Sequence, residues 1–352
     1  MTQLDLFLPF GLPPPEMARD LLRELKMPAL AMLLARATRI EHQTTDDFSR
    51  ALPHEIRLAH LLGLPDRGME SSPAIATAMM RRFDLSGAEG TWFMLQPVHL
   101  HIAQDHLVLT DPRQLALSEE EARALFSAVQ PLFDEYGHTL LFGDASTWFL
   151  RANAWADLQT STPDAASGHN VDIWMPKGKH ERDWRRLQNE VQMHWHTHAV
   201  NEAREMSGRK VVNSIWLWGG APASASAGSD NGKTNVTGFT LPGSIDPYAM
   251  SLEHAVPVTS VDDIVRAAPR HGVLILDELT GLALGNAWAE WLATMGHYEA
   301  IWFAPLLAAL RNGDLDRLTI TVSHDHALAT YAAGKSSLRK FWRKPSLVPL
   351  AA

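Results

Sequence analysis

Cysteine is absent from the 352 residues of this chain. Its absence excludes disulfide bridges, thiolate zinc sites and a cysteine nucleophile, and it suits the reducing cytoplasm. No apolar run approaches the roughly 18 residues that a membrane-spanning helix needs. The N-terminal segment also lacks the basic region that opens a signal peptide. We therefore expect a cytoplasmic protein without a signal peptide or a membrane span.

Excess positive charge is missing as well. The formal net charge is −9, and before residue 335 no stretch combines clustered Lys and Arg with aromatic residues. A nucleic-acid backbone needs such a basic field, so we expect no nucleic-acid partner. Hydrophobic residues make up 46% of the chain and charged residues 20%, which is the composition of a globular protein. At this length two domains are expected.

Strands and helices alternate along much of the chain, which predicts an α/β fold. An apolar strand over Leu4–Phe10 ends at a proline cluster, and helices follow up to about residue 85. Later in the chain, Val273–Leu276 reads as a strand, and Leu318–Val322 with Ala327–Ala332 reads as a hairpin.

Residues 91–155 have a different order, in which two strands, a helix and two more strands follow one another. This order predicts an inserted α+β module with a polar exit loop. A long helix over His180–Met206 comes next, and the apolar run Val211–Trp218 then predicts a buried, central strand of a parallel sheet. The expected architecture is a central sheet flanked by helices, formed by residues 1–90 and 180–352, with a smaller α+β domain inserted at 91–179.

One segment resembles a known family. Residues 198–220 read HAVNEAREMSGRKVVNSIWLWGG, which is similar to the His-Pro-x-Asn and Ala-Asn-x-x-Trp-Leu-Trp-Gly motifs of archaeal-type cofactor-independent phosphoglycerate mutases. Pro28–Leu34 and Arg57–Gly63 resemble two helical segments of the same family, in the same order. The chain looks closest to a proteobacterial branch that carries mutase-like or Rpf-type regulatory labels. The resemblance implies an alkaline-phosphatase-like fold, two metal ions and a Ser or Thr nucleophile.

The residues that the resemblance requires for chemistry are replaced. Pro9-Phe10-Gly11 stands where the family has a metal-binding Asp followed by Gly, and Pro53-His54-Glu55 stands where it has Gly-Ser-Asp with the nucleophile. The metal segment Asp-Glu-x-x-His has only a remnant in Met295-Gly296-His297, and the closing Asp-His pair corresponds to Asp325-His326. His297, Asp325 and His326 are thus the metal candidates, too few for a pair of divalent ions.

These losses indicate a diverged, catalytically inactive relative of the mutases that binds a metabolite or acts in regulation. An alternative is an active mutase or phosphohydrolase, dependent on Mn²⁺ or Mg²⁺, in which His54 or Glu55 replaces the hydroxyl nucleophile, because a histidine can carry a phosphoryl group. The Asp325-His326 pair has a second interpretation as a polar hairpin turn.

A phosphorylated small-molecule acid is the expected ligand, and it needs fixed positive charge and hydrogen-bond donors. We predict that five residues approach a common cleft between the domains: Arg151, His198, Asn201, Arg204 and Asn213. The alternative is that both arginines pair with surface acids such as Asp157 and Glu205.

Three further patterns have structural as well as functional interpretations. His194 and His198 have the spacing of a zinc pair but lack the glutamate of a zinc protease, so a helix-end cluster that bonds to the backbone is favoured. Residues 227–234 match a permissive phosphate-loop pattern, but no helix is expected to follow. The basic segment 335–345 could touch anionic lipid or RNA, although we favour its folding onto the acidic surface with Phe341 and Trp342 in the core.

Overall fold

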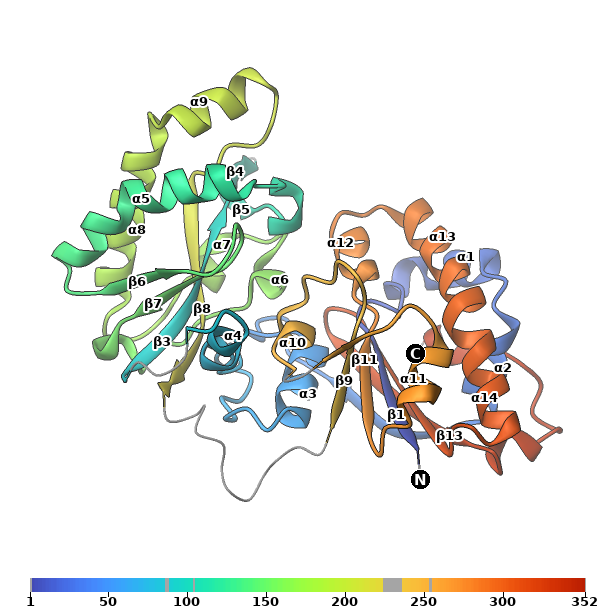
Figure 1. The fold of residues 1–352 in the computed structure, drawn as a ribbon. Coiled ribbons are helices and arrows are strands. Elements are labelled where there is room, and N and C mark those ends of the chain that lie inside the picture. The colour runs from blue at the N-terminus through green and yellow to red at the C-terminus, as the bar shows by residue number, and fades with distance from the viewer. Residues whose placement is uncertain (1, 86–88, 104, 224–235, 253–254, 352) are drawn as a thin grey trace. The chain divides into compact units, whose positions relative to one another are not determined.

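The computed structural model describes residues 2–85, 89–103, 105–223, 236–252 and 255–351. Residues 1–47 and 234–352 form one compact unit, and residues 48–233 form the other. We call them the parallel-sheet unit and the antiparallel-sheet unit, after the main sheet that each contains (Figure 1).

The parallel-sheet unit is built on seven strands in the order β10-β9-β11-β1-β12-β13-β2. The first five are parallel to one another, whereas β13 and β2 are antiparallel to their neighbours. In the order of the sheet they are β10 (Val256–Pro257), β9 (Thr237–Thr240), β11 (Gly272–Ile275), β1 (Gln3–Leu8), β12 (Arg317–Ser323), β13 (Ala327–Gly334) and β2 (Thr38–Thr44). Leu4, Leu6 and Leu8 of β1 are fully buried, because this strand lies in the middle of the sheet.

Helices surround this sheet (Figure 1). They are α1 (Pro15–Glu24), α2 (Pro28–Arg36), α10 (Pro247–Met250), α11 (Val261–Ala267), α12 (Glu278–Leu284), α13 (Trp288–Tyr298) and α14 (Ala304–Asn312). A π-helical turn, Glu299–Phe303, joins α13 to α14. The buried Glu299 carboxylate accepts hydrogen bonds from the N–H groups of Ala29 (2.6 Å) and Leu30 (3.1 Å), and it thereby caps the start of α2.

The antiparallel-sheet unit contains four strands in the order β6-β7-β3-β8 and a separate hairpin, β4-β5. The strands are β3 (Thr91–Val98), β4 (Leu100–Ala103), β5 (His106–Leu109), β6 (Thr139–Phe142), β7 (Trp148–Arg151) and β8 (Ser214–Pro222). The helices are α3 (Pro53–Leu61), α4 (Ala76–Arg82), α5 (Glu119–Glu135), α6 (Pro163–Ala166), α7 (Val171–Trp174), α8 (Glu181–His196) and α9 (Ala199–Met206). Short 3₁₀ turns complete the description of both units: Pro112–Leu115, Asn153–Trp155, Ser337–Arg339 and Val348–Ala351.

The α/β fold class is confirmed, with a mostly parallel sheet flanked by helices. The inserted unit, however, starts at residue 48 and ends at 233, and it is the larger of the two, not a smaller module over 91–179. The reason is β8, which pairs antiparallel with β3 along its length and so holds the chain after residue 180 in this unit. The prediction that Val211–Trp218 is a central strand of a parallel sheet is therefore wrong. β8 lies at the edge of its sheet, and its pairing is antiparallel.

The burial of that strand was predicted correctly. Trp216 and Trp218 are each 1% exposed, because α8 and α4 pack against β8. A strand covered on both faces has a continuous apolar sequence whatever the direction of its neighbour, so the apolar pattern does not distinguish a parallel from an antiparallel partner.

Two other elements differ from expectation. The helix over His180–Met206 is divided into α8 and α9 by a break at Thr197 and His198. Strand β2 was not predicted, because it lies at the edge of its sheet and its residues are mostly exposed and polar. In the part of the chain that the structure describes, no helix combines the length and apolar character that a membrane crossing requires.

Candidate functional site

Pro53, His54 and Glu55, which replace the family's nucleophile segment, form the first turn of α3. Proline suits the first helical position because it needs no hydrogen-bond donor there. The Glu55 carboxylate accepts hydrogen bonds from the backbone N–H of Leu52 (2.7 Å) and from the Thr162 hydroxyl (2.7 Å). Glu55 is buried and caps its own helix, so its carboxylate is already engaged within the protein.

The buried His54 lies beside a partly buried charged cluster. Its side chain is 2% exposed, and burial lowers its pKa to about 4, while the Asp164 carboxylate raises the pKa and the Arg113 guanidinium lowers it. Arg113 pairs with Asp164 at 2.7 Å and with Asp111 at 3.0 Å. Burial has the largest influence on the Asp111 carboxyl and raises its pKa, although the Arg113 charge acts in the opposite direction. His54 is therefore neutral at pH 7 and largely inaccessible to a ligand from solvent.

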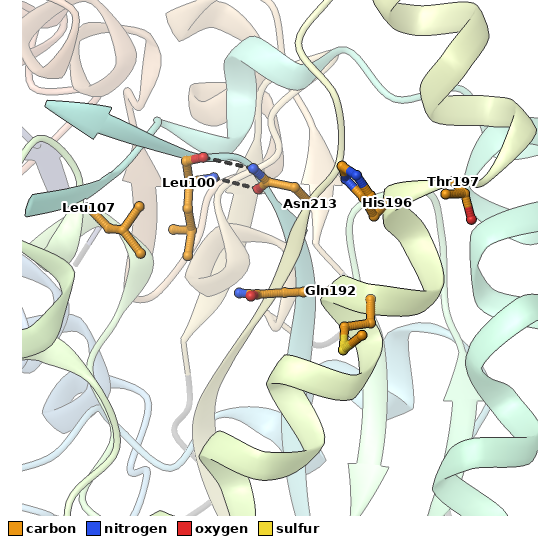
Figure 2. Close-up of a pocket in the computed structure, with 7 residues that line it drawn as sticks. Leu100, Leu107, Gln192, His196, Thr197 and Asn213 are labelled. Carbon is orange, nitrogen blue, oxygen red and sulfur yellow. Dashed lines mark hydrogen bonds between the residues drawn. The ribbon is translucent and has the colours of Figure 1, made fainter.

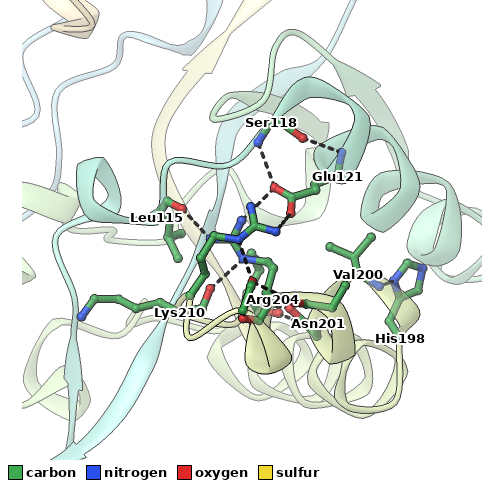
Figure 3. Close-up of polar contacts among 12 residues, drawn as sticks. Leu115, Ser118, Glu121, His198, Val200, Asn201, Arg204 and Lys210 are labelled. Atoms are coloured by element: carbon green, nitrogen blue, oxygen red, sulfur yellow. Dashed lines mark hydrogen bonds and ion pairs between the residues drawn. The ribbon is translucent and has the colours of Figure 1, made fainter.

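Arg204 forms the centre of a second polar network, shown in Figure 3. It is 0% exposed. Its guanidinium donates to the Glu121 carboxylate (2.8 Å), to the Lys210 carbonyl (2.7 Å) and to the Leu115 carbonyl. Each of its three nitrogens therefore already donates to a protein oxygen, so the guanidinium is engaged within the protein.

Glu121 connects this network to the start of α5. Its carboxylate accepts from the backbone N–H of Ser118 (3.1 Å), and its own N–H donates to the Ser118 hydroxyl (3.2 Å). Arg209 contacts the same carboxylate at 2.9 Å. Burial raises the pKa of Glu121, but the Ser118 N–H and the two arginine charges outweigh burial and hold the pKa below its usual value.

Asn201 and His198 fix the turn between α8, α9 and β8. The Asn201 amide donates to the carbonyls of Trp195 (2.9 Å) and Val212 (2.8 Å) and accepts from the Val212 N–H (2.8 Å). The His198 ring accepts from the Val200 N–H (3.2 Å) and so caps α9. These mutase-like residues hold the helix-to-strand connection together.

Arg151 and Asn213 have other surroundings. The half-buried Arg151 donates to the Thr139 hydroxyl (2.8 Å), and its guanidinium lies 5.9 Å from the centre of the Trp92 ring. The Asn213 amide accepts from the Leu100 N–H and donates to the Leu100 carbonyl, both at 2.8 Å. The alternative that both arginines pair with acids is met only by Arg204, whose partner is Glu121 rather than Glu205. The described contacts of Arg151 do not include Asp157.

A pocket of about 510 Å³ opens beside Asn213 (Figure 2). Its walls combine apolar and uncharged polar side chains, with no Lys or Arg: Leu100, Leu107, Gln192, Met193, His196, Thr197 and Asn213. Asn213 is therefore the one predicted ligand residue that lines it. Gln192, which donates to the Ser214 hydroxyl (3.0 Å), extends from α8 towards Leu100 and Leu107.

Sequence reasoning did not assign Gln192 and His196 to a site. Their spacing of four residues places them on one face of α8, next to an exposed Met193. Met193 falls outside the apolar stripe that α8 buries, and this offset was the available signal for the pocket; the stripe consists of Trp184, Leu187, Val191 and Trp195.

The metal candidates lie in the parallel-sheet unit. Asp325 follows β12 and contacts the imidazoles of His324 and His326, the latter at 3.3 Å. Burial raises the pKa of Asp325, but the His324 hydrogen bond and the charge of His326 outweigh it and lower the pKa. His297 is exposed on α13. Among the described residues no three His, Asp or Glu side chains are grouped so as to hold a metal ion, so these residues do not fit the implied metal pair.

An acidic pair that was not predicted as a site, Asp277-Glu278, lies just after β11. Asp277 accepts a hydrogen bond from the Ser244 hydroxyl (2.9 Å). Burial raises the pKa of the nearby Tyr298 hydroxyl, and the charges of Glu278 and Asp277 raise it further. Asp277-Glu278 matches the first two residues of the Asp-Glu-x-x-His metal motif, which the segment at His297 does not. Gly281 stands at the position of the motif's histidine. Acids directly after an apolar strand were the signal for it.

Three further sequence patterns can be compared with the structure: the phosphate-loop pattern, the histidine pair and the aromatic residues of the basic segment. The phosphate-loop pattern at 227–234 lies outside the described residues. His194 is exposed, and His198 bonds to the backbone as the favoured interpretation expected. The expectation that Phe341 and Trp342 pack in the core is wrong, since both side chains are exposed.

Comparison with known proteins finds similarity both in sequence and among solved structures. No family model matches the chain. A stretch of 120 residues is 27% identical to 2,3-bisphosphoglycerate-independent phosphoglycerate mutase of Methanosarcina mazei; it covers 34% of this chain and only 27% of the mutase.

Among solved structures, the PH0037 protein from Pyrococcus horikoshii is similar with a TM-score of 0.56 and 12% identity, over 95% of this chain and 87% of that one. The cofactor-independent phosphoglycerate mutase from Thermoplasma acidophilum has a TM-score of 0.43 and 14% identity, over 100% of this chain and 94% of that one. The chain therefore has the fold of PH0037, and the predicted resemblance to the cofactor-independent phosphoglycerate mutases is confirmed as a sequence similarity over about a third of its length.

Proposed function

We propose that this chain is a phosphoglycerate-mutase-like protein without mutase chemistry, which binds a metabolite or acts in regulation. The observation that carries the proposal is the first turn of α3, where the family has its hydroxyl nucleophile. His54 is buried there, and the Glu55 carboxylate is engaged by Leu52 and Thr162. Neither side chain is presented to a substrate as a nucleophile must be.

The metal chemistry supports the same proposal. Phosphoryl transfer in this family needs two cations to neutralise the oxygens of the entering and leaving groups. Among the residues that the structure describes, Asp325 has only His324 and His326 as close partners, and Asp277 accepts a hydrogen bond from Ser244. Neither group supplies the set of carboxylates and imidazoles that two divalent ions require.

The expected ligand remains a phosphorylated small acid, and Arg151 is the cation that we assign to it. Arg204 is fully buried and paired, whereas Arg151 is half-buried with a single hydroxyl partner and an aromatic neighbour. A guanidinium held by so few partners can turn part of its fork to a phosphate or carboxylate.

A thermal-shift comparison of 3-phosphoglycerate and phosphoenolpyruvate with glycerate and pyruvate tests this proposal. We expect the phosphorylated acids to raise the Tm of the wild-type chain and to lose this effect in Arg151→Ala. The matched control is Arg123→Ala, which removes another guanidinium placed over an aromatic ring in the same unit and should leave the effect unchanged. Absence of stabilisation by any phosphorylated acid would refute metabolite binding of this class.

The alternative function is phosphoryl transfer through His54, dependent on Mn²⁺ or Mg²⁺. The observation that favours it is the low pKa of His54, about 4, which keeps the imidazole in its neutral, nucleophilic form at pH 7. Its burial opposes this function, because the surrounding residues must move before a phosphate reaches the ring. A phosphohistidine found by mass spectrometry after incubation with 2,3-bisphosphoglycerate, and lost in His54→Gln, would favour this alternative.

A further inference from the structure

The segment after β13 forms a surface loop that is held at both ends. Leu338 and Leu350 are buried. Between them, the Ser346 N–H donates to the Ala31 carbonyl (3.2 Å), and the Tyr331 hydroxyl donates to the Pro349 carbonyl (2.9 Å). Residues 339–344, which we call the tail loop, lie between these anchors, so their presentation is fixed by the fold of the parallel-sheet unit.

Two large aromatic side chains of the tail loop face solvent. Phe341 is 81% exposed and Trp342 is 67% exposed. Their rings pack edge to face, with centroids 5.3 Å apart and planes at 82°. Trp342 is the one exposed residue among the chain's twelve tryptophans, all of which the structure describes; the others are buried or, for Trp288, partly buried. Adjacent exposed rings of this size mark an interaction surface.

Four basic residues flank this ring pair within the same loop: Arg339, Lys340, Arg343 and Lys344. In the described part of the chain none of them forms an ion pair with a carboxylate. Lys340 donates to the Arg36 carbonyl (3.2 Å), and Arg343 donates to the carbonyls of Ala35 and Ala37 (3.3 Å each), at the negative end of α2. These contacts orient the two side chains but leave the positive charge of the loop without a counter-ion from the protein.

We propose that the tail loop docks this protein on an anionic membrane surface. Phe341 and Trp342 would enter the headgroup region, where aromatic rings are favoured, while the basic side chains contact lipid phosphates. Each Lys or Arg near an anionic leaflet adds attraction. The contact is local, and because the Debye length is about 8 Å at physiological salt, the net charge of −9 acts on it only weakly.

The geometry favours a membrane over a single-stranded nucleic acid. Strand binding needs a basic groove that follows several nucleotides and open ring faces on which bases stack. Here the perpendicular rings cover part of each other, and the cations are confined to one short loop. A nucleic-acid strand that extended beyond the loop would cross the surface of an acidic protein, which repels its phosphates. A membrane contacts only the protruding residues.

Vesicle flotation with the full-length chain tests the proposal. We expect binding to vesicles of 70% phosphatidylcholine and 30% phosphatidylserine to be about tenfold or more stronger than binding to pure phosphatidylcholine, and to weaken at high salt. The double variants Phe341→Ser/Trp342→Ser and Arg339→Ala/Lys344→Ala should each lose at least about tenfold. The matched control is Arg182→Ala/Arg185→Ala, which removes two exposed arginines from α8 and should bind like wild type.

Quenching by brominated lipid gives a second readout. Because the other tryptophans are shielded, quenching should come from Trp342 and should disappear in Trp342→Phe while flotation persists. Equal binding to neutral and anionic vesicles, no binding to either, or tight binding to oligo-dT or poly-U with no vesicle binding would each overturn the proposal.

Discussion

Arginine has opposite surroundings in two parts of this molecule. Arg204 is fully buried, and Glu121 and two backbone carbonyls take up its donors. Arg339 of the tail loop is exposed, in a loop whose four cations have no carboxylate partner among the described residues. The first lies in the segment that most resembles the mutases, and the second lies in a segment without that resemblance.

A motif that resembles a known family does not by itself mark a ligand site. A polar side chain can be retained because the fold requires it, and its hydrogen bonds are then directed into the protein. A charge that the protein leaves unpaired at its surface is the better indication of an external partner. Substitutions should therefore affect stability in the first group and binding in the second.

The largest effect is expected for Arg204→Ala. Removing the guanidinium leaves the buried Leu115 carbonyl and the part-buried Lys210 carbonyl without their donor, and Glu121 with one partner fewer. The free energy of unfolding should therefore fall by about 3–5 kcal/mol, measured by urea denaturation. Arg209→Ala is the matched control, because Arg209 contacts the same carboxylate from a side chain that is 46% exposed. It should cost no more than about 1 kcal/mol. Similar losses in both variants would contradict a structural role that is specific to the buried Arg204.

His54 should make stability depend on pH. In the unfolded chain its pKa is 6.5, and in the fold it is about 4, so the unfolded state binds the proton more readily. Stability should therefore fall as pH decreases from 6.5 to about 4, by about 3 kcal/mol in total from this group. Urea denaturation across that range should show a shallower loss for His54→Gln than for wild type. The exposed His196, changed to Gln, should follow wild type, and parallel curves for all three proteins would contradict the burial of a neutral His54.

Asn213→Ala should have a smaller effect, about 1–2 kcal/mol, because it removes the two hydrogen bonds that the amide forms with the Leu100 backbone. Thr197→Ala, at another position in the wall of the same pocket, should change stability by less than about 0.5 kcal/mol. Chemical denaturation checks both values. An Asn213→Ala chain as stable as wild type would show that the amide is free to serve a ligand.

The smallest effect is expected for Arg339→Ala, because an exposed side chain without an ion-pair partner contributes little to stability. The change in the free energy of unfolding should stay within about 0.5 kcal/mol. A loss above about 1 kcal/mol, seen by the same denaturation assay, would mean that the tail loop is part of the fold rather than a surface for a partner.

The fold could be predicted from the sequence where local signals suffice. Ser118 followed by Glu121 marks the start of α5 through its capping box, and the strands β6, β7, β12 and β13 lie where their apolar patterns indicate. Strand pairing is not local, so nothing in Val211–Trp218 revealed that β8 would pair antiparallel with β3. That pairing sets the bounds of the second unit.

The site was harder to predict than the fold. The sequence shows which residue types replace the family's chemistry, but burial and partners decide what they do, as Glu55 and Arg204 show. The exposure of Phe341 and Trp342 also depends on where the chain after β13 is anchored. Aromatic composition alone favoured the core.

Turnover of 3-phosphoglycerate decides whether this chain has lost mutase chemistry. Purified full-length chain, supplied in turn with Mn²⁺, Mg²⁺ and Co²⁺, is incubated with 3-phosphoglycerate and followed by ³¹P NMR for 2-phosphoglycerate. We expect no interconversion above the rate without protein, since the nucleophile position holds a buried histidine and an engaged glutamate. A turnover number in the range of about 1 to 10³ s⁻¹ typical of working enzymes, abolished by His54→Gln, would contradict it.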